Sequence, residues 1–207
     1  SIGTIEDEDF SEQGSVSLEQ VEAFKHQQLP LFDASKEAEM KELIVEAKED
    51  GDSVGGVVET FVLGLDAGYG NPFFDSVESQ LAHLVFAVPA IKGIEFGTGF
   101  EITKMRGSEA NDEYYYDEQG DIKTRSNNNG GIIGGITYGM PVVFRAAVKP
   151  PASIKKKQQT INVEEGKAAE LEVEGRHDPC IVPRVLPVLE AVTALGLMDL
   201  MIGGHTA

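Results

Sequence analysis

The 207-residue sequence lacks tryptophan, has a single cysteine and is poor in basic residues. Because Cys180 has no partner, an intrachain disulfide is impossible, and no spaced Cys/His set is present that would bind a structural metal. We therefore expect a reducing, cytoplasmic location and no metal site. The sequence has only 17 basic residues but 35 acidic ones. The resulting formal net charge of −18 disfavours nucleic acid and anionic membrane surfaces as partners.

The sequence also lacks a long apolar run free of charge. Its most hydrophobic stretch, 182–202, contains Arg184, Glu190, Asp199 and two prolines. Each such charge costs about 2.5–3.5 kcal/mol near the centre of a bilayer. A buried core helix is therefore expected here rather than a membrane span. The first residues contain no basic-then-apolar leader, so no signal peptide is expected either.

Hydrophobic residues make up 41% of the chain, enough for a packed core. Apolar spacing predicts helices over about 36–50 and 77–88 and from about 183 onward, with Ser35 as one cap and Asp75 with Glu78 as another. β-Branched runs predict strands over 57–63, 91–96 and 142–148 and a hairpin over 162–173. Between the second and third strands we expect a short helix over 100–105 and a polar loop over 111–129. Residues 1–32 indicate a strand followed by a polar loop. This irregular order favours an α+β fold, with 1–207 as a single domain.

The charge is unevenly distributed. Residues 1–60 hold 16 acidic and 4 basic side chains, whereas residues 125–184 hold 6 acidic and 9 basic ones. An anionic small ligand is therefore expected in the second region. Within it, Arg176, His177 and Asp178 are consecutive, and Pro179 restricts Asp178 to extended backbone angles. Arg176 can bind phosphate or carboxylate through two parallel hydrogen bonds. The alternative is an ordinary Arg–Asp pair and a surface histidine at the start of a helix.

Three further polar clusters are candidates for a site. The run 126–131, continued by Gly134 and Gly135, would let backbone N–H groups approach a planar or anionic ligand, although a structural glycine bend is the alternative. The loop 149–154 is stiffened by two prolines, and the three lysines that follow it are interpreted as solvated. The run 106–112 fits a functional segment and a turn about equally well.

Taken in order, these segments resemble the chorismate synthase family. The similarity runs through Pro89-Ala90-Ile91-Lys92-Gly93-Ile94-Glu95-Phe96-Gly97, Arg106–Asp112, Ser126–Ile136, Lys149–Ile154 and Gly175–Cys180, and covers essentially residues 54–202. Each piece is weak alone, but the ordered set is specific. The resemblance implies an enzyme that converts 5-enolpyruvylshikimate 3-phosphate to chorismate and phosphate with reduced FMN, in the shikimate pathway. In such enzymes the flavin supplies the electronic chemistry and the protein supplies position and charge.

The resemblance also assigns residues. The positions that match flavin-contacting positions of the family are Pro89, Ala90, Gly134, Lys149, Pro150, Pro151, Ala152, Ser153 and Arg176. Asp178 matches the family's acid–base aspartate. The family fold implies two mostly antiparallel sheets between outer helix layers and a homotetramer. Whether the protein also reduces its own flavin is left open.

One departure from the family pattern is large. The family's N-terminal segment carries two catalytic histidines, most substrate arginines and an Arg-Ser-Ser flavin contact, and no part of this sequence matches it. The remaining histidines, His26, His83 and His205, lie in unmatched contexts. The chain is therefore expected to be the C-terminal portion of the fold and to be inactive alone.

Two other hypotheses stay open. The chain could be a non-catalytic flavin-binding, phosphate-binding or oligomerisation module, or an unrelated α+β protein with structural glycine loops. The enzyme hypothesis makes one geometric prediction. The glycine bend near Gly134, the loop 149–153 and the Arg176/Asp178 corner should line a single cavity.

Overall fold

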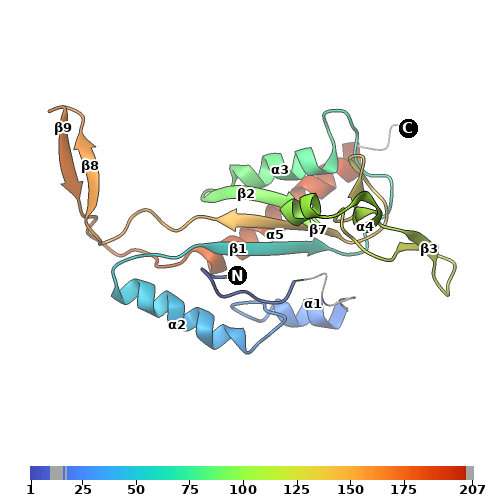
Figure 1. The fold of residues 1–207 in the computed structure, drawn as a ribbon, viewed down its shortest axis with the longest axis horizontal. Helices are drawn as coiled ribbons and strands as arrows, with labels where there is room; N and C mark the ends of the chain where they lie inside the picture. The colour runs from blue at the N-terminus through green and yellow to red at the C-terminus, as the bar shows by residue number, and fades with distance from the viewer. Residues whose placement is uncertain (10–15, 17, 204–207) are drawn as a thin grey trace.

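The computed structural model describes residues 1–9, 16 and 18–203 (Figure 1). Its helices are α1 (Leu18–Phe24), α2 (Lys36–Glu49), α3 (Val77–Ala87), α4 (Gly107–Ala110) and α5 (Val182–Gly203), with a 3₁₀ helix at Gly99–Lys104. Its strands are β1 (Gly56–Val62), β2 (Ile91–Phe96), β3 (Tyr114–Tyr116), β4 (Ile122–Thr124), β5 (Ile132–Ile133), β6 (Ile136–Thr137), β7 (Val142–Val148), β8 (Gln158–Asn162) and β9 (Lys167–Leu171).

A three-stranded antiparallel sheet, in the order β1-β7-β2, forms the centre of the molecule. β7 lies in the middle and alternates as the sequence predicts. Val142, Phe144, Ala146 and Val148 are buried in the core, whereas Arg145 lies on the opposite face. β7 has one end at Val142 and the other at Val148, and the surrounding loops gather at these two ends.

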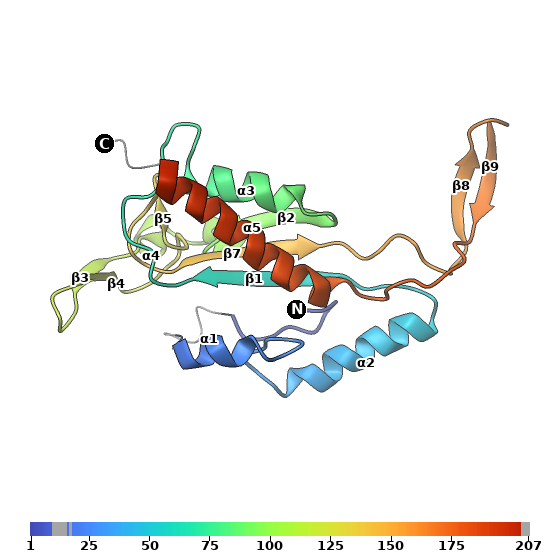
Figure 2. The same cartoon turned by 180° about the vertical axis from the view of Figure 1, so that it is seen from behind.

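Helices α3 and α5 cover the core face of this sheet (Figures 1 and 2). Val77, Leu81 and Val85 form the buried stripe of α3, and Leu189 is among the buried residues of α5. Gly196 allows the two helices to approach closely, since a Cβ there would lie 2.7 Å from Leu84 Cδ1. Among the described residues α5 is long and apolar enough to span a membrane, but one of its faces packs into this core.

The rest of the described chain lies around the sheet. Residues 1–5, α1 and α2 run below β1 in Figure 1, and Met40 of α2 is buried in the same core. The β3–β4 and β5–β6 hairpins lie at the Val142 end of β7. The β8–β9 hairpin projects from the opposite end, as both views show (Figures 1 and 2).

The α+β class is confirmed, and the core helices and the strands of the central sheet lie where the sequence predicts them. The described residues supply one three-stranded sheet and three separate hairpins rather than two larger sheets. Ser35 is the N-cap residue of α2, as predicted, although its side chain makes no capping hydrogen bond. Two local predictions are wrong. The cap of α3 is Ser76, which accepts from Ser79 N, and not Asp75, and residues 18–24 are helical. The loop 111–129 also contains the β3–β4 hairpin.

Candidate functional site

Three loops that are distant in sequence meet at the Val148 end of β7. The backbone N–H of Lys149 donates to the carbonyl oxygen of Ala90 at 2.9 Å. The Ser53 hydroxyl donates to Pro151 O at 2.6 Å, and Val54 N donates to Pro179 O at 2.8 Å. The turn 51–55 therefore joins the loop 149–153 to the segment that carries Arg176 and Asp178.

Ala90 stands at this junction in an uncommon backbone conformation. Its φ is 74°, and Ala90 is the only described residue other than glycine that has a positive φ. A left-handed conformation costs an alanine of the order of 1 kcal/mol, and such strain persists only where the surroundings impose it. Here the carbonyl group of Ala90 is held by Lys149 N. This hydrogen bond holds the 89–90 turn against the loop 149–153.

The predicted site residues at this end are accessible. Pro89, Lys149, Pro150, Ala152, Ser153 and Arg176 are exposed, and Ala90, Pro151 and Asp178 are half-buried. Asp178 accepts from Arg184 Nη1 at 2.6 Å, so the arginine that pairs with it lies in the first turns of α5. Arg176 is left to line a separate hollow. The sequence alternative of an Arg–Asp pair at the start of the helix is thus realised with Arg184.

The hollow beside Arg176 has a volume of about 140 Å³. Its walls come from the last turn of α2 with the turn after it, from Ile154 and Lys155, and from the segment 175–179. His177 also lines it, and its Nε2 lies 3.1 Å from Val173 O. The volume is below the 300–1,000 Å³ typical of whole-ligand pockets, so it suits a small group.

Gly134 lies at the opposite end of β7. It is exposed in the β5–β6 turn, and the next residue, Gly135, accepts from Val77 N at the start of α3. The strand from Val142 to Val148 spans roughly 20 Å. The hollow beside Arg176 is lined by no residue of the β5–β6 turn. The prediction that all three pieces line one cavity in a single chain is therefore wrong, because β7 separates them.

A second polar centre, which the sequence analysis listed only as an ambiguous cluster, surrounds Asp112. This carboxylate is 6% exposed and accepts from Ser126 Oγ, from Asn128 N and from both the backbone and side-chain nitrogens of Asn129. Burial alone would raise its pKa, but the hydrogen bonds from Ser126 and Asn129 outweigh burial and lower it. The network fixes the run 126–131.

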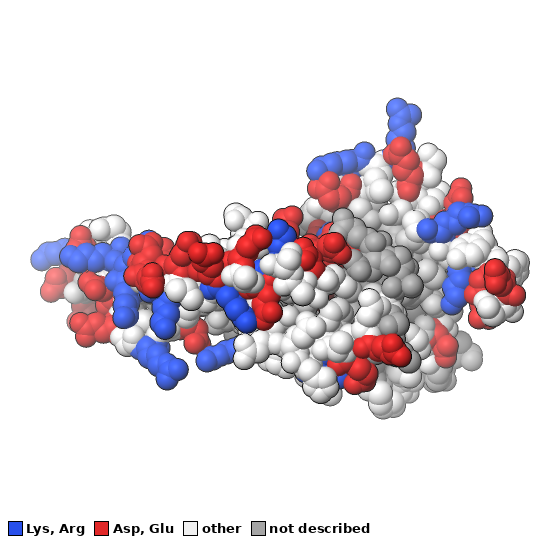
Figure 3. All heavy atoms as spheres, turned by 90° about the horizontal axis from the view of Figure 1, so that it is seen from below, with Lys and Arg blue, Asp and Glu red and all other residues white. Residues whose placement is uncertain are grey.

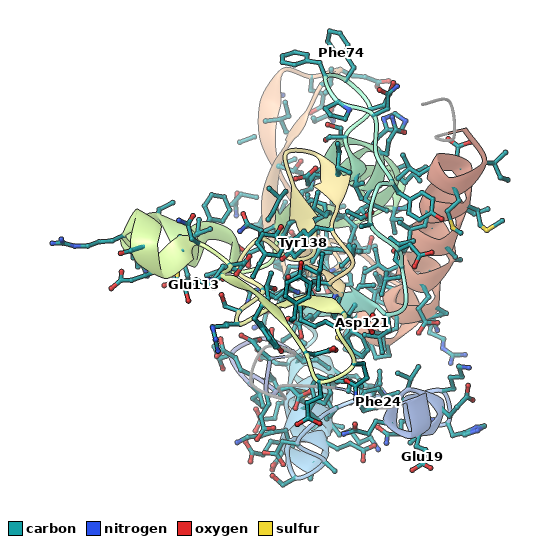
Figure 4. The ribbon with its side chains drawn as sticks, turned by 90° about the vertical axis from the view of Figure 1, so that its right-hand side faces the viewer. Glu19, Phe24, Phe74, Glu113, Asp121 and Tyr138 are labelled. Atoms are coloured by element: carbon teal, nitrogen blue, oxygen red, sulfur yellow. The ribbon has the colours of Figure 1, made fainter. Side chains whose placement is uncertain are left out.

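Tyr138 completes this network from the strand-connecting turn. Its hydroxyl donates to Asn127 Oδ1 at 2.8 Å and lies 3.3 Å from Asp112 Oδ2. Burial, followed by the charge of Asp112, raises the pKa of Tyr138 above its ordinary range. Figure 4 shows Tyr138 among these loops, with Glu113 and Asp121 on neighbouring segments. Sequence pattern could not show this burial, because it arises from loops brought together by the fold.

A larger hollow of about 570 Å³ lies beside the β3–β4 hairpin, lined in part by Tyr115, Lys123, Arg125 and Met140. None of the predicted site residues lines it. It is wide and polar, and Arg125 already stacks over the Tyr115 ring at 5.3 Å. Size alone would favour this hollow. The convergence of loops favours the Val148 end of β7, and so does Arg176, which forms no ion pair with a described carboxylate.

Comparison with known proteins decides the family. The family described as chorismate synthase matches residues 2–202. The chain belongs to the chorismate synthase family. It is 51% identical over 168 residues to the chorismate synthase of Methanocaldococcus jannaschii, covering 81% of this chain and 44% of that protein. Over 151 residues it is 56% identical to the chorismate synthase of Chitinophaga pinensis, covering 73% of this chain and 45% of that protein.

A solved structure agrees with this assignment. A crystal structure of chorismate synthase superposes with a TM-score of 0.79 at 31% identity, covering all of this chain and 56% of that chain. The present chain therefore spans less than half the length of the curated chorismate synthases it matches, and little more than half of the solved one. The family assignment confirms the resemblance deduced from the ordered sequence segments.

Proposed function

We propose that the chain forms part of a chorismate synthase, which converts 5-enolpyruvylshikimate 3-phosphate to chorismate and phosphate with reduced FMN. The observation that supports this most is the convergence of Ala90, the loop 149–153 and the Arg176 segment at one end of β7. These are positions that the family resemblance assigns to flavin contact. Their joint accessibility is what a cofactor wall requires.

The residues at this end suit an anionic cofactor. Lys149 and Arg176 are exposed cations that form no ion pair with a described carboxylate. Lys149 and the proline-stiffened loop would hold the polar part of FMN, and Arg176 can form two parallel hydrogen bonds to an oxyanion. When bound, reduced flavin supplies electron density that assists departure of the allylic phosphate.

We assign proton handling to Asp178. Its carboxylate is half-buried and oriented by Arg184 at 2.6 Å, while Pro179 restricts its backbone. A positioned carboxylate can hold the proton that leaves the substrate ring as phosphate departs. Arg184 acts here as a positioning residue for Asp178.

Gly134 requires a different arrangement. It lies roughly 20 Å from Lys149 along β7, farther than the fused rings of one flavin reach. We therefore place Gly134 against a flavin whose other contacts come from a second copy, within the expected homotetramer of a cytoplasmic enzyme.

We further propose that the 207-residue chain has no turnover alone, because it spans less than half of its curated relatives. The assay is anaerobic chorismate formation from 5-enolpyruvylshikimate 3-phosphate with reduced FMN. No product above background is expected. Robust turnover would contradict the claim of inactivity while supporting the assigned reaction.

Flavin binding tests the site itself. FMN should bind saturably to the chain, with and without substrate, and Arg176→Ala should weaken that binding. Arg184→Ala is the matched control, since it removes an exposed arginine of the same region that we place against Asp178 rather than FMN. The absence of any FMN affinity would reject the assignment and favour structural glycine loops. Binding without turnover in the complete enzyme would favour the non-catalytic module.

A further inference from the structure

The small hollow beside Arg176 is unusual in its charge. Lys48, Lys155 and Arg176 line it from three separate segments. None of these three cations forms an ion pair with a carboxylate in the described part of the chain. The chain carries twice as many acidic as basic residues, and most of its other lysines and arginines are paired. Three cations without a described carboxylate partner therefore lie around one hollow.

The acidic residue in the lining does not cancel this charge. Asp52 is paired with Lys156 Nζ at 3.0 Å and also accepts from Ser53 N. Hydrogen bonds from Lys156, and then from Ser53, lower the pKa of Asp52. Lys156 binds Asp50 as well. The lining thus carries three cations against the single carboxylate of Asp52, and that carboxylate is shared with Lys156. Figure 3 shows basic side chains gathered among acidic ones at the end that carries α2 and the β8–β9 hairpin.

The backbone holds two of the three segments together. The N–H groups of Lys155 and Lys156 both donate to Gly51 O, at 2.9 and 3.3 Å. Gly51 has a φ of 67°, and a Cβ there would lie 3.1 Å from Lys155 Cβ. Only glycine fits this position without strain. The turn after α2 therefore holds the backbone of Lys155 at a defined position beside the hollow. Lys48 lies one turn earlier in α2 and reaches the same hollow.

We infer that this hollow, lined by Lys48, Lys155 and Arg176, binds the phosphoryl group of a phosphate or phosphomonoester. A volume of about 140 Å³ admits a tetrahedral oxyanion but not a fused ring system. Arginine contributes a planar fork and the lysines contribute point charges, which together suit a group with several oxygens. The inference stands on charge and geometry, and it adds Lys48 and Lys155 to the site proposed above. Two sources share this chemistry: the phosphate of FMN and the inorganic phosphate released from the substrate.

The test is a titration of the 207-residue chain with inorganic phosphate by isothermal calorimetry, at constant ionic strength set by chloride. The chain should bind one equivalent, and Lys48→Gln and Lys155→Gln should each weaken binding roughly fivefold. Lys157→Gln is the matched control, since Lys157 is an exposed lysine paired with Glu170 on the projecting hairpin. All three substituted lysines are exposed, and circular dichroism melting should confirm that each variant is folded.

Titration with FMN and with riboflavin, which lacks the phosphate, separates the two sources. If the hollow takes the FMN phosphate, Lys48→Gln weakens FMN binding roughly fivefold and leaves riboflavin affinity unchanged. If it takes free phosphate, inorganic phosphate still binds to the FMN-saturated chain. The inference is overturned if neither phosphate nor FMN affinity depends on Lys48 and Lys155, or if Lys157→Gln has an equal effect. FMN binding that persists in Lys48→Gln with no phosphate binding would overturn this inference alone and leave the proposed flavin site standing.

Discussion

Replacement of Asp112 by alanine tests whether one buried carboxylate organises the run 126–131. The substitution removes the acceptor of Ser126 Oγ and of the backbone N–H groups of Asn128 and Asn129. A buried donor left without an acceptor costs about 1–3 kcal/mol. The side-chain amide of Asn129 loses its acceptor as well. With two backbone donors and two side-chain donors affected, we expect a loss of roughly 3–5 kcal/mol in the free energy of unfolding.

The assay is urea unfolding followed by circular dichroism at pH 7, repeated at lower pH. The pKa of Asp112 is lowered in the folded state, so its ionised form contributes stability above the unfolded-state pKa of about 3.9. That contribution is lost as the pH falls through the lower folded-state pKa. The difference between the wild-type chain and Asp112→Ala should therefore be largest near neutrality and should shrink below about pH 4.

A matched control is Glu118→Ala, which removes an exposed carboxylate from the turn of the β3–β4 hairpin. Its unfolding free energy should stay within about 0.5 kcal/mol of the wild-type value. The reasoning is refuted if Asp112→Ala costs less than about 1 kcal/mol, or if its cost is unchanged between pH 7 and pH 3.

Three further predictions concern packing, backbone strain and the α5 ion pair. Leu189→Ala, at a fully buried position of α5, should lower the unfolding free energy by about 2–5 kcal/mol in urea titration. Leu195→Ala, at a position of the same helix that is 66% exposed, should cost less than about 1 kcal/mol. Equal losses would contradict the assigned core face of α5. Gly131→Ala should lower the unfolding free energy by over about 2 kcal/mol in thermal melting, because its φ is 80° and a Cβ would clash with Pro141 O. Gly134→Ala should cost only about 1 kcal/mol, because its φ is 62° but a Cβ there would meet no other atom. Arg184→Ala should change stability by less than about 1 kcal/mol, since that arginine is largely exposed, yet it should slow chorismate formation in the complete enzyme; unaltered turnover would show that Asp178 needs no positioning.

The elements that the sequence predicts best are those with strong periodicity. β7 alternates, and α3 carries an apolar stripe at helical spacing, so local pattern and tertiary environment agree. Prediction was poorer at helix starts. Ser76 and Asp75 are adjacent and chemically equivalent as caps, and only the backbone conformation, with ψ of 152° at Ser76, selects between them.

The candidate site was only partly predictable, for a geometric reason. Ordered motifs identified Ala90, Lys149 and Arg176, and the fold brings their segments together through backbone contacts. The same motifs included Gly134, yet motif order carries no information about distance along β7. Lys48 and Lys155 were not selected, because a lysine's lack of an acidic partner becomes visible only once the chain is folded. Asp112 was hidden for a similar reason, since its donors come from residues 14–17 positions later.

Hydrogen exchange with and without FMN tests most directly whether the cofactor binds at the Val148 end of β7. Amides are monitored by mass spectrometry over the whole chain. We predict slower exchange in 89–92, 149–155 and 174–181 when FMN is bound, and little change in 114–124 beside the larger hollow. Protection confined to 114–124, or no protection anywhere, would contradict the assignment.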